Sequence, residues 1–155
     1  MHVLSKHRNK KGGVAGFTLI EMMLSIALIA IIAGISVPIY QSFQVRNDLD
    51  IATVTIAHSL RRAQLLAQAS DGDTDWGIAL QTNAISLFKG TSYSARDASY
   101  DETFDLPGSL APSGMSEVVF EKFTGLPQTT GTITVTSNTN EARSITINQR
   151  GMVSY

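Results

Sequence analysis

The stretch Gly16-Phe17-Thr18-Leu19-Ile20-Glu21 stands between a basic N-terminal segment and a long apolar run. It places one carboxylate, that of Glu21, near the start of a segment that is otherwise suited to lipid. A charged side chain inside a bilayer costs roughly 2.5 to 3.5 kcal/mol on insertion scales. We therefore expect Glu21 to have a function and a partner.

Residues 17–39 form an apolar run of 23 residues in which Glu21 is the only charge. A helix of that length rises about 34 Å, enough to cross a hydrocarbon core of about 30 Å. Acidic Asp48 and Asp50 follow the run, and a cluster of basic residues with no acid among them precedes it. These are Lys6, Arg8, Lys10 and Lys11. The positive-inside rule then predicts a single-pass topology with the N-terminus in the cytoplasm and the C-terminus outside.

A cleaved secretory signal is the rival interpretation of the same segment, since it also has a basic start and an apolar middle. Its apolar region would be shorter, about 7 to 15 residues, and would contain no glutamate. Gly34 and Ser36 offer only a loose cleavage site. The pattern favours an anchor over a signal.

Charge is unevenly distributed along the 155 residues, whose formal net charge is −1. Without residues 1–16 the chain keeps 8 basic and 13 acidic side chains, a net charge of −5 (8 − 13). Such a body is not expected to bind nucleic acid without specific contacts. No cysteine is present, so the fold cannot depend on disulfides. An apolar content of 43% and a length of 155 residues fit one anchored globular head.

After Pro38 the apolar residues become confined to one side of the predicted helix. They recur at spacings of three and four, at Val45, Leu49, Ala52, Ile56, Leu60, Ala63 and Leu66. Ser70-Asp71-Gly72 supplies a stop signal. If Pro38 only kinks the helix, residues 17–69 form one helix of 53 residues.

Short β-strands are predicted downstream. Residues 76–80 and 84–88 flank a hairpin turn at Gln81-Thr82-Asn83. Residues 89–115 are rich in Ser, Gly, Asp and Pro and predict a long surface loop. Further strands are expected at residues 117–123, 132–136, 143–148 and 152–155. A long helix followed by an antiparallel β-sheet is an α+β fold.

Together, the basic segment ending in Gly16, the Phe17-to-Glu21 stretch, the apolar helix and Pro38 resemble a type IV prepilin-like protein. The resemblance implies a type IV pilin-like fold and cleavage after Gly16 by prepilin peptidase. It also implies N-methylation of Phe17 and a subunit contact made by Glu21. Gly34 and Pro38 would mark a segment that can lose helical hydrogen bonds in a filament. Physically, the Glu21 carboxylate can meet the new amine of a neighbouring chain, each offsetting the desolvation of the other.

The expected organisation has three parts: a leader at 1–16, a transmembrane and assembly segment at 17–39, and the rest of the helix with a β head at 40–155. The expected partners are prepilin peptidase, other pilin or pseudopilin subunits, the inner-membrane assembly platform and membrane lipid. The subunit would start in the cytoplasmic (inner) membrane and move into a pilus or pseudopilus, in the periplasm or at the cell surface.

The body also resembles the GspH/FimT group of minor pilins and pseudopilins. The matching residues include Arg62, Ala63, Trp76-Gly77-Ile78 and Gly151. The sequence does not distinguish between a type IV pilus and a type II secretion pseudopilus as the assembly to which the subunit belongs. A DNA-binding minor pilin for DNA uptake and a membrane-anchored receptor head that does not assemble are the alternatives. For DNA, the C-terminal end offers only Arg143 and Arg150.

Other candidate sites are weaker. Asp71, Asp73 and Asp75 alternate like calcium ligands, but Trp76 and Thr82 break the calcium-loop pattern, so a solvated turn is expected. His58 has no nucleophile or acid readable around it and is expected to be structural. The chain shows no common hydrolase or phosphate-loop motif, and neither enzymatic activity nor a cofactor is expected. The loop also carries a group of acids, interpreted as a solvated surface: Asp97, Asp101, Glu102 and Asp105.

Overall fold

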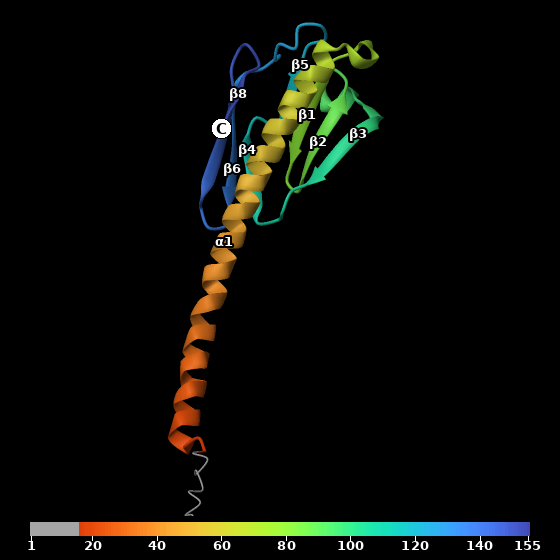
Figure 1. The fold of residues 1–155 in the computed structure, drawn as a ribbon. Coiled ribbons are helices and arrows are strands. Elements are labelled where there is room, and N and C mark those ends of the chain that lie inside the picture. Colours follow the sequence, from red (N-terminus) through yellow and green to blue (C-terminus); the bar gives the residue numbers. More distant parts are fainter. Residues whose placement is uncertain (1–15) are drawn as a thin grey trace, which may run out of the picture. The chain divides into compact units, whose positions relative to one another are not determined.

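The computed structural model describes residues 16–155, with the side chains of residues 36–39 outside that description. One long α-helix, α1 (Leu19–Gln68), spans 50 of these residues (Figure 1). The chain divides into two compact units, Met1–Ile39 and Tyr40–Tyr155, and α1 contributes to both. Because α1 includes residue 38, the prediction that helix continues past Pro38 is confirmed.

The second unit, here called the head, contains the C-terminal half of α1 and all the β-strands. Five of the seven residues in the predicted apolar stripe are fully or almost fully buried, while Val45 and Leu66 are half-buried. Thr53 lies on the same buried side and satisfies its hydroxyl by donating to the Leu49 carbonyl at 2.7 Å. The period of three and four therefore identifies the side of α1 that faces the sheets.

Sheet A is antiparallel, with strand order β3-β2-β1-β5. The predicted hairpin is confirmed, because Gln81 pairs with Ala84 and leaves Thr82 and Asn83 as the turn. Its four strands are β1 (Trp76–Gln81), β2 (Ala84–Lys89), β3 (Asp97–Asp105) and β5 (Glu117–Phe120).

Sheet B is also antiparallel, with strand order β4-β6-β7-β8. Its strands are β4 (Leu110–Gly114), β6 (Gly131–Ser137), β7 (Ala142–Ile147) and β8 (Val153–Ser154). The prediction of an antiparallel sheet on a long helix is confirmed, although the strands divide into two sheets. In Figure 1, β1, β2 and β3 lie on one side of the head's part of α1, and β6 and β8 lie on the other.

The prediction of a loop over residues 89–115 is wrong. A 3-10 helix (Tyr93–Ala95), β3 and β4 occupy most of it, while a second 3-10 helix (Asp71–Asp73) precedes β1. The β3 composition is polar because this edge strand exposes much of its surface, yet the backbone pairs with β2 from Ala84↔Asp105 to Leu87↔Glu102. Pro107 and Gly108 fall in the connection between β3 and β4, where the chain passes from sheet A to sheet B.

One hydrophobic core joins α1 to both sheets. Leu60 of α1, Leu87 of sheet A and Ile133 of sheet B are each fully buried in it. A smaller cluster covers the other surface of sheet A, where Phe88 packs edge-to-face on Tyr93 with ring centroids 5.6 Å apart. The core fixes the C-terminal half of α1 to the two sheets. The opposite, exposed side of this half is therefore the side that other molecules can contact.

Candidate processing and assembly site

Thr18 caps the start of α1. The Glu21 amide donates to the Thr18 hydroxyl at 3.3 Å, and the Met22 amide donates to the Thr18 carbonyl at 3.2 Å. The Thr-x-x-Glu spacing is that of a capping box, in which the side chains of the cap and of the third helical residue both serve the helix start. Thr18 was not predicted as a helix cap from the sequence, although the Thr-x-x-Glu spacing is itself a sequence signal for one.

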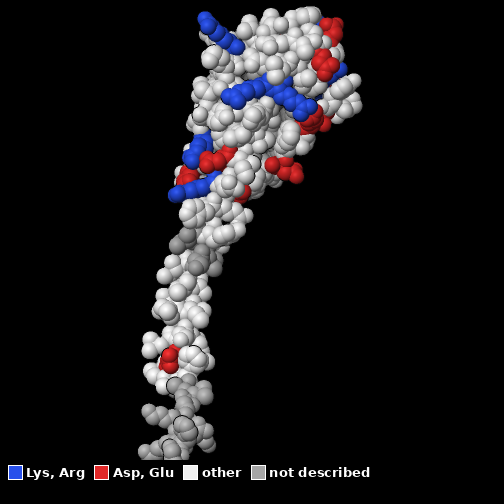
Figure 2. All heavy atoms as spheres, viewed as in Figure 1, with Lys and Arg blue, Asp and Glu red and all other residues white. Residues whose placement is uncertain are grey.

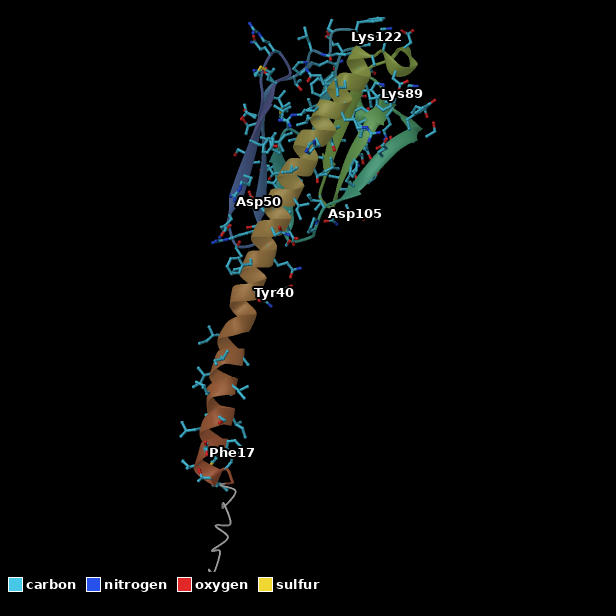
Figure 3. All side chains as sticks on the ribbon, in the orientation of Figure 1. Phe17, Tyr40, Asp50, Lys89, Asp105 and Lys122 are labelled. Atoms are coloured by element: carbon cyan, nitrogen blue, oxygen red, sulfur yellow. The ribbon has the colours of Figure 1, made fainter. Side chains whose placement is uncertain are left out.

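Gly16 and Phe17 precede the helix and have no helical backbone. Phe17 is 80% exposed, and a Cβ atom added to Gly16 would meet nothing within 4 Å. Figure 3 shows the Phe17 side chain at the beginning of α1. An exposed, non-helical peptide bond is the kind of backbone that a protease can bind. The basic residues of the expected leader lie outside the described residues.

Glu21 lies in the first turn of α1, and its backbone carbonyl accepts a hydrogen bond from the Ser25 hydroxyl at 2.8 Å. Its position in the first turn suits a carboxylate, because the helix dipole is positive there. The surrounding surface is apolar all round, and Figure 2 shows acidic atoms on it but no basic ones. The exposed residues that make this surface include Leu19, Ile20, Met22, Met23, Leu24, Ile26, Leu28, Ile29, Ile31 and Ile32.

By length and composition this part of α1 can span a membrane. Residues 19–39 rise about 32 Å at 1.5 Å per residue, against about 30 Å for a hydrocarbon core. An exposed apolar surface on every side of a helix is what lipid, or a bundle of similar helices, would cover.

Gly34 and Pro38 are four residues apart, the spacing between the acceptor and the donor of one α-helical hydrogen bond. The proline at 38 has no amide hydrogen, so the Gly34 carbonyl lacks its usual donor four residues later. Nothing lies within 4 Å of a Cβ atom placed on Gly34. The pair therefore removes one hydrogen bond and one side chain from the same turn.

On the head, α1 keeps a second set of apolar residues on its outer side. Phe43 is 65% exposed, Ile51 55% and Leu65 65%, and Val54 is partly exposed. Because Leu49 and Ile56 on the opposite side are fully buried, this outer stripe is not required by the head's own core. Exposed apolar residues gathered along one element indicate a contact surface.

The four acidic residues of the predicted loop lie on β3, and three of them make side-chain contacts. Asp101 pairs with Arg96 at 2.7 Å, and the Arg62 guanidinium makes a two-point contact with Glu102. The hydroxyl and the amide of Ser99 both donate to Asp97 and lower the pKa of that carboxyl below its ordinary value, the hydroxyl having the larger effect. Of these contacts, the Arg62–Glu102 pair links β3 to α1, and the other two are local to residues 96–101.

The three aspartates after α1 do not converge. Asp73 pairs with Lys122, and the two oxygens of Asp75 accept from the Lys122 amide at 2.9 Å and from Gln128 at 3.1 Å. Asp75 therefore joins the start of β1 to the chain after β5. Within residues 16–155, no three His, Cys, Asp or Glu side chains gather as a metal site would require.

Two other candidates lie apart from the start of α1. His58 is exposed on the outer side of α1. Arg143 on β7 pairs with Asp50 of α1 at 3.0 Å, so its charge is already matched within the chain, whereas Arg150 is exposed in the turn before β8. Among the predicted site residues that the structure describes, Gly16, Phe17 and Glu21 therefore lie together at the start of α1, and Gly34 and Pro38 lie together further along it.

Comparison with known proteins gives three findings. A family model described as the prokaryotic N-terminal methylation motif matches residues 11–37. Two fimbrial proteins of Pseudomonas aeruginosa are each 30% identical to this chain over 111 residues, which cover 66% of this chain and 72% of the relative. The structure of the minor pseudopilin EpsH from the Type 2 Secretion System of Vibrio cholerae matches with a TM-score of 0.53 and 13% identity, over 69% of this chain and 94% of that one.

A capped apolar helix followed by two antiparallel sheets defines the class of type IV pilin-like folds, which the EpsH likeness supports at the level of fold. With the methylation motif and the fimbrial relatives, this chain belongs to the type IV pilin and pseudopilin family. The family consists of structural subunits, and the motif with its apolar helix indicates a membrane-anchored one.

Proposed function

We propose that this chain is a minor pilin or pseudopilin subunit that is processed at its N-terminus and assembled through α1. Prepilin peptidase cuts between Gly16 and Phe17, and the new amine of Phe17 is methylated. The observation that carries the proposal is the position of Glu21, the only charged residue in 17–39, in the first turn of an otherwise apolar helix.

In the assembled filament the Glu21 carboxylate pairs with the amine of a neighbouring subunit. Both groups are costly in an apolar environment when alone, and close pairing offsets part of that cost. A displaced neighbour would leave both charges unpaired, so the pair also selects one axial register. Thr18 supports this role because it fixes the helix start that positions Glu21.

Residues 34–38 are the part of α1 that loses helical hydrogen bonds when the helix packs in a filament. The missing amide hydrogen of Pro38 and the weak helix propensity of Gly34 support this assignment, because opening the helix there costs less than elsewhere. The outer stripe of α1, at Phe43, Ile51, Val54 and Leu65, supplies the corresponding contact on the head.

Before assembly the subunit is a single-pass protein of the inner membrane, with its leader in the cytoplasm and its head outside. It is then taken up by the assembly platform and joins a type IV pilus or a type II secretion pseudopilus. The fold of the minor pseudopilin EpsH supports a minor role. DNA capture has less support, because Arg143 is paired with Asp50 and the processed chain carries a net charge of −5 (8 − 13).

Intact mass spectrometry of the full chain, produced together with a prepilin peptidase, tests the processing step. We expect a product of 139 residues (155 − 16) that begins at Phe17 and carries one added methyl group. A Gly16→Leu variant is the matched control and should keep Met1, because a large side chain replaces the glycine at the cut. A parent chain that also keeps Met1 would contradict the proposal and favour an anchored receptor head.

A further inference from the structure

The edge of β7 that faces away from β6 is only partly covered. β8 pairs with β7 through Thr146↔Ser154 and Ile147↔Val153, and no described strand pairs with residues 142–145 on that side. Strand β7 begins at residue 142, so about two thirds of it has an open edge.

The hydrogen-bond parity of the ladder shows which groups point out of that edge. The Ser137 amide of β6 donates to the Glu141 carbonyl at 2.8 Å, and on the other side the Asn148 amide donates to the Met152 carbonyl at 3.2 Å. Successive residues of an antiparallel strand alternate between its two neighbours. The odd-numbered residues of β7 therefore face β6, and the amide and carbonyl of Ser144 face outward.

A groove of about 330 Å³ lies beside this edge, between β7 and α1. Thr53 and Val54 of α1 line it, together with Ser144 of β7 and Tyr155. The Asp50–Arg143 ion pair, at 3.0 Å, is also part of its lining (Asp50 is labelled in Figure 3). The Tyr155 ring is in turn contacted by Arg61, whose guanidinium carbon lies 5.5 Å from the ring centre.

The dimensions of the groove suit a short strand. The uncovered part of β7, residues 142–145, extends about 13 Å at 3.3 Å per residue, so a strand of about four residues would cover it. The α1 residues that line the groove, from Asp50 to Val54, rise about 6 Å and fall within that length.

The other sheet edges are protected against strand addition. β3 carries several acids, β4 carries Pro112, and β8 is only two residues long. β5 is covered where the Gln128 amide donates to the Val119 carbonyl at 2.9 Å. Acidic side chains, proline and covering segments are the usual means by which proteins block edge pairing. The edge at Ser144 instead opens onto a groove with an apolar side chain, Val54, in its wall.

We propose that this groove binds an extended segment of a neighbouring pilin-like subunit, which adds a strand to β7 beside β8. The inference rests on the proposed function, because Val54 belongs both to the groove and to the outer stripe of α1 assigned to subunit contact. The occupant is a strand of about four residues with alternating apolar and polar side chains, its apolar set facing α1. Backbone bonds to Ser144 hold it, and the stripe continues the interface.

A proline substitution at Ser144 tests the inference. Ser144→Pro removes the outward amide hydrogen without removing a bond to β6, and Ser144→Ala keeps that hydrogen. The full-length parent and both variants are expressed in cells that assemble the filament, and the amount of chain in the sheared filament fraction is measured. We expect Ser144→Ala to match the parent and Ser144→Pro to fall at least fivefold.

Equal recovery of all three chains would overturn the inference and leave the proposed function intact. If all three chains, the parent included, were absent from the filament fraction, the proposed function would be refuted. The inference would then fail as well, because it needs a neighbouring subunit to supply the strand. If Ser144→Pro fails to fold, amide exchange of the parent decides. Exchange at Ser144 should be at least tenfold slower in filaments than in detergent micelles, and an unchanged rate would overturn the proposal.

Discussion

Gly77, at the centre of sheet A, is a position where one added methyl group should have a measurable effect. It lies opposite Phe88 on β2 and opposite Val119 on β5. A Cβ atom on residue 77 would lie 2.7 Å from Cζ of Phe88 and 2.7 Å from the Val118 carbonyl oxygen. The Phe88 ring is fully buried and packs edge-to-face on Tyr93, so it has little room to move.

The cost of Gly77→Ala follows from these contacts. Forcing a methyl group into a packed site destabilises a protein by roughly 1 to 3 kcal/mol. The lower entropy of alanine in the unfolded chain offsets about 0.4 to 1 kcal/mol of this. We expect a net loss of about 1 to 2 kcal/mol, because relief of the clash with the Val118 carbonyl requires movement of the backbone. For a domain of this size that loss lowers Tm by roughly 4 to 10 °C.

Trp76 supplies the assay, since it is the single tryptophan and is 4% exposed. Its fluorescence reports unfolding of the head in full-length chain held in detergent micelles. In a double-mutant cycle, Gly77→Ala should cost at least about 0.5 kcal/mol less in a Phe88→Ala background than in the parent, because the clash with Phe88 is gone and only the clash with the Val118 carbonyl remains. A Gly77→Ala chain as stable as the parent, or additivity within about 0.5 kcal/mol, would refute the packing argument.

Three further predictions concern the cap, the core and one carboxylate. Thr18→Ala should destabilise the start of α1 by about 1 kcal/mol, while Thr18→Ser should not, as amide exchange in micelles would show. Leu60→Ala should cost roughly 2 to 5 kcal/mol in the Trp76 assay, and Leu65→Ala, on the exposed side, less than about 0.5; equal costs would contradict the assigned orientation of α1. Ser99→Ala should raise the pKa of Asp97 toward its ordinary value in an NMR titration, and an unchanged pKa would contradict the assigned cause. Because the folded pKa of Asp97 is lowered, its stabilising contribution is complete above the ordinary pKa and is lost as the pH falls through the folded value.

The elements with a strong periodic pattern could be predicted from the sequence. The stripe from Leu49 to Ala63 identified the buried side of α1, and the turn at Thr82-Asn83 identified the first hairpin. β3 could not be predicted in this way, because a polar edge strand owes its structure to pairing with β2 rather than to an apolar side of its own. The division into two sheets depends on long-range pairing of the same kind, such as β4 with β6.

The candidate site at the start of α1 could be predicted from the sequence because its residues are neighbours in the chain. A single acid in an apolar run, next to a glycine and a basic segment, needs no knowledge of tertiary structure. Thr18 was missed although its spacing to Glu21 was equally local. The partners of Asp50, Asp75 and Glu102 lie far away in sequence, so their ion pairs and hydrogen bonds became visible only with the fold.

Recovery of a Glu21→Gln chain in the sheared filament fraction tests the central claim most directly. The substitution removes the charge and keeps the shape, so processing at Phe17 should continue while the pair with a neighbouring amine is lost. Asp71→Asn, which removes one exposed carboxylate from the head, is the matched control. We predict that Glu21→Gln falls at least tenfold below the parent while Asp71→Asn matches it; a Glu21→Gln chain that is processed and enters filaments at the parent's level would contradict the claim.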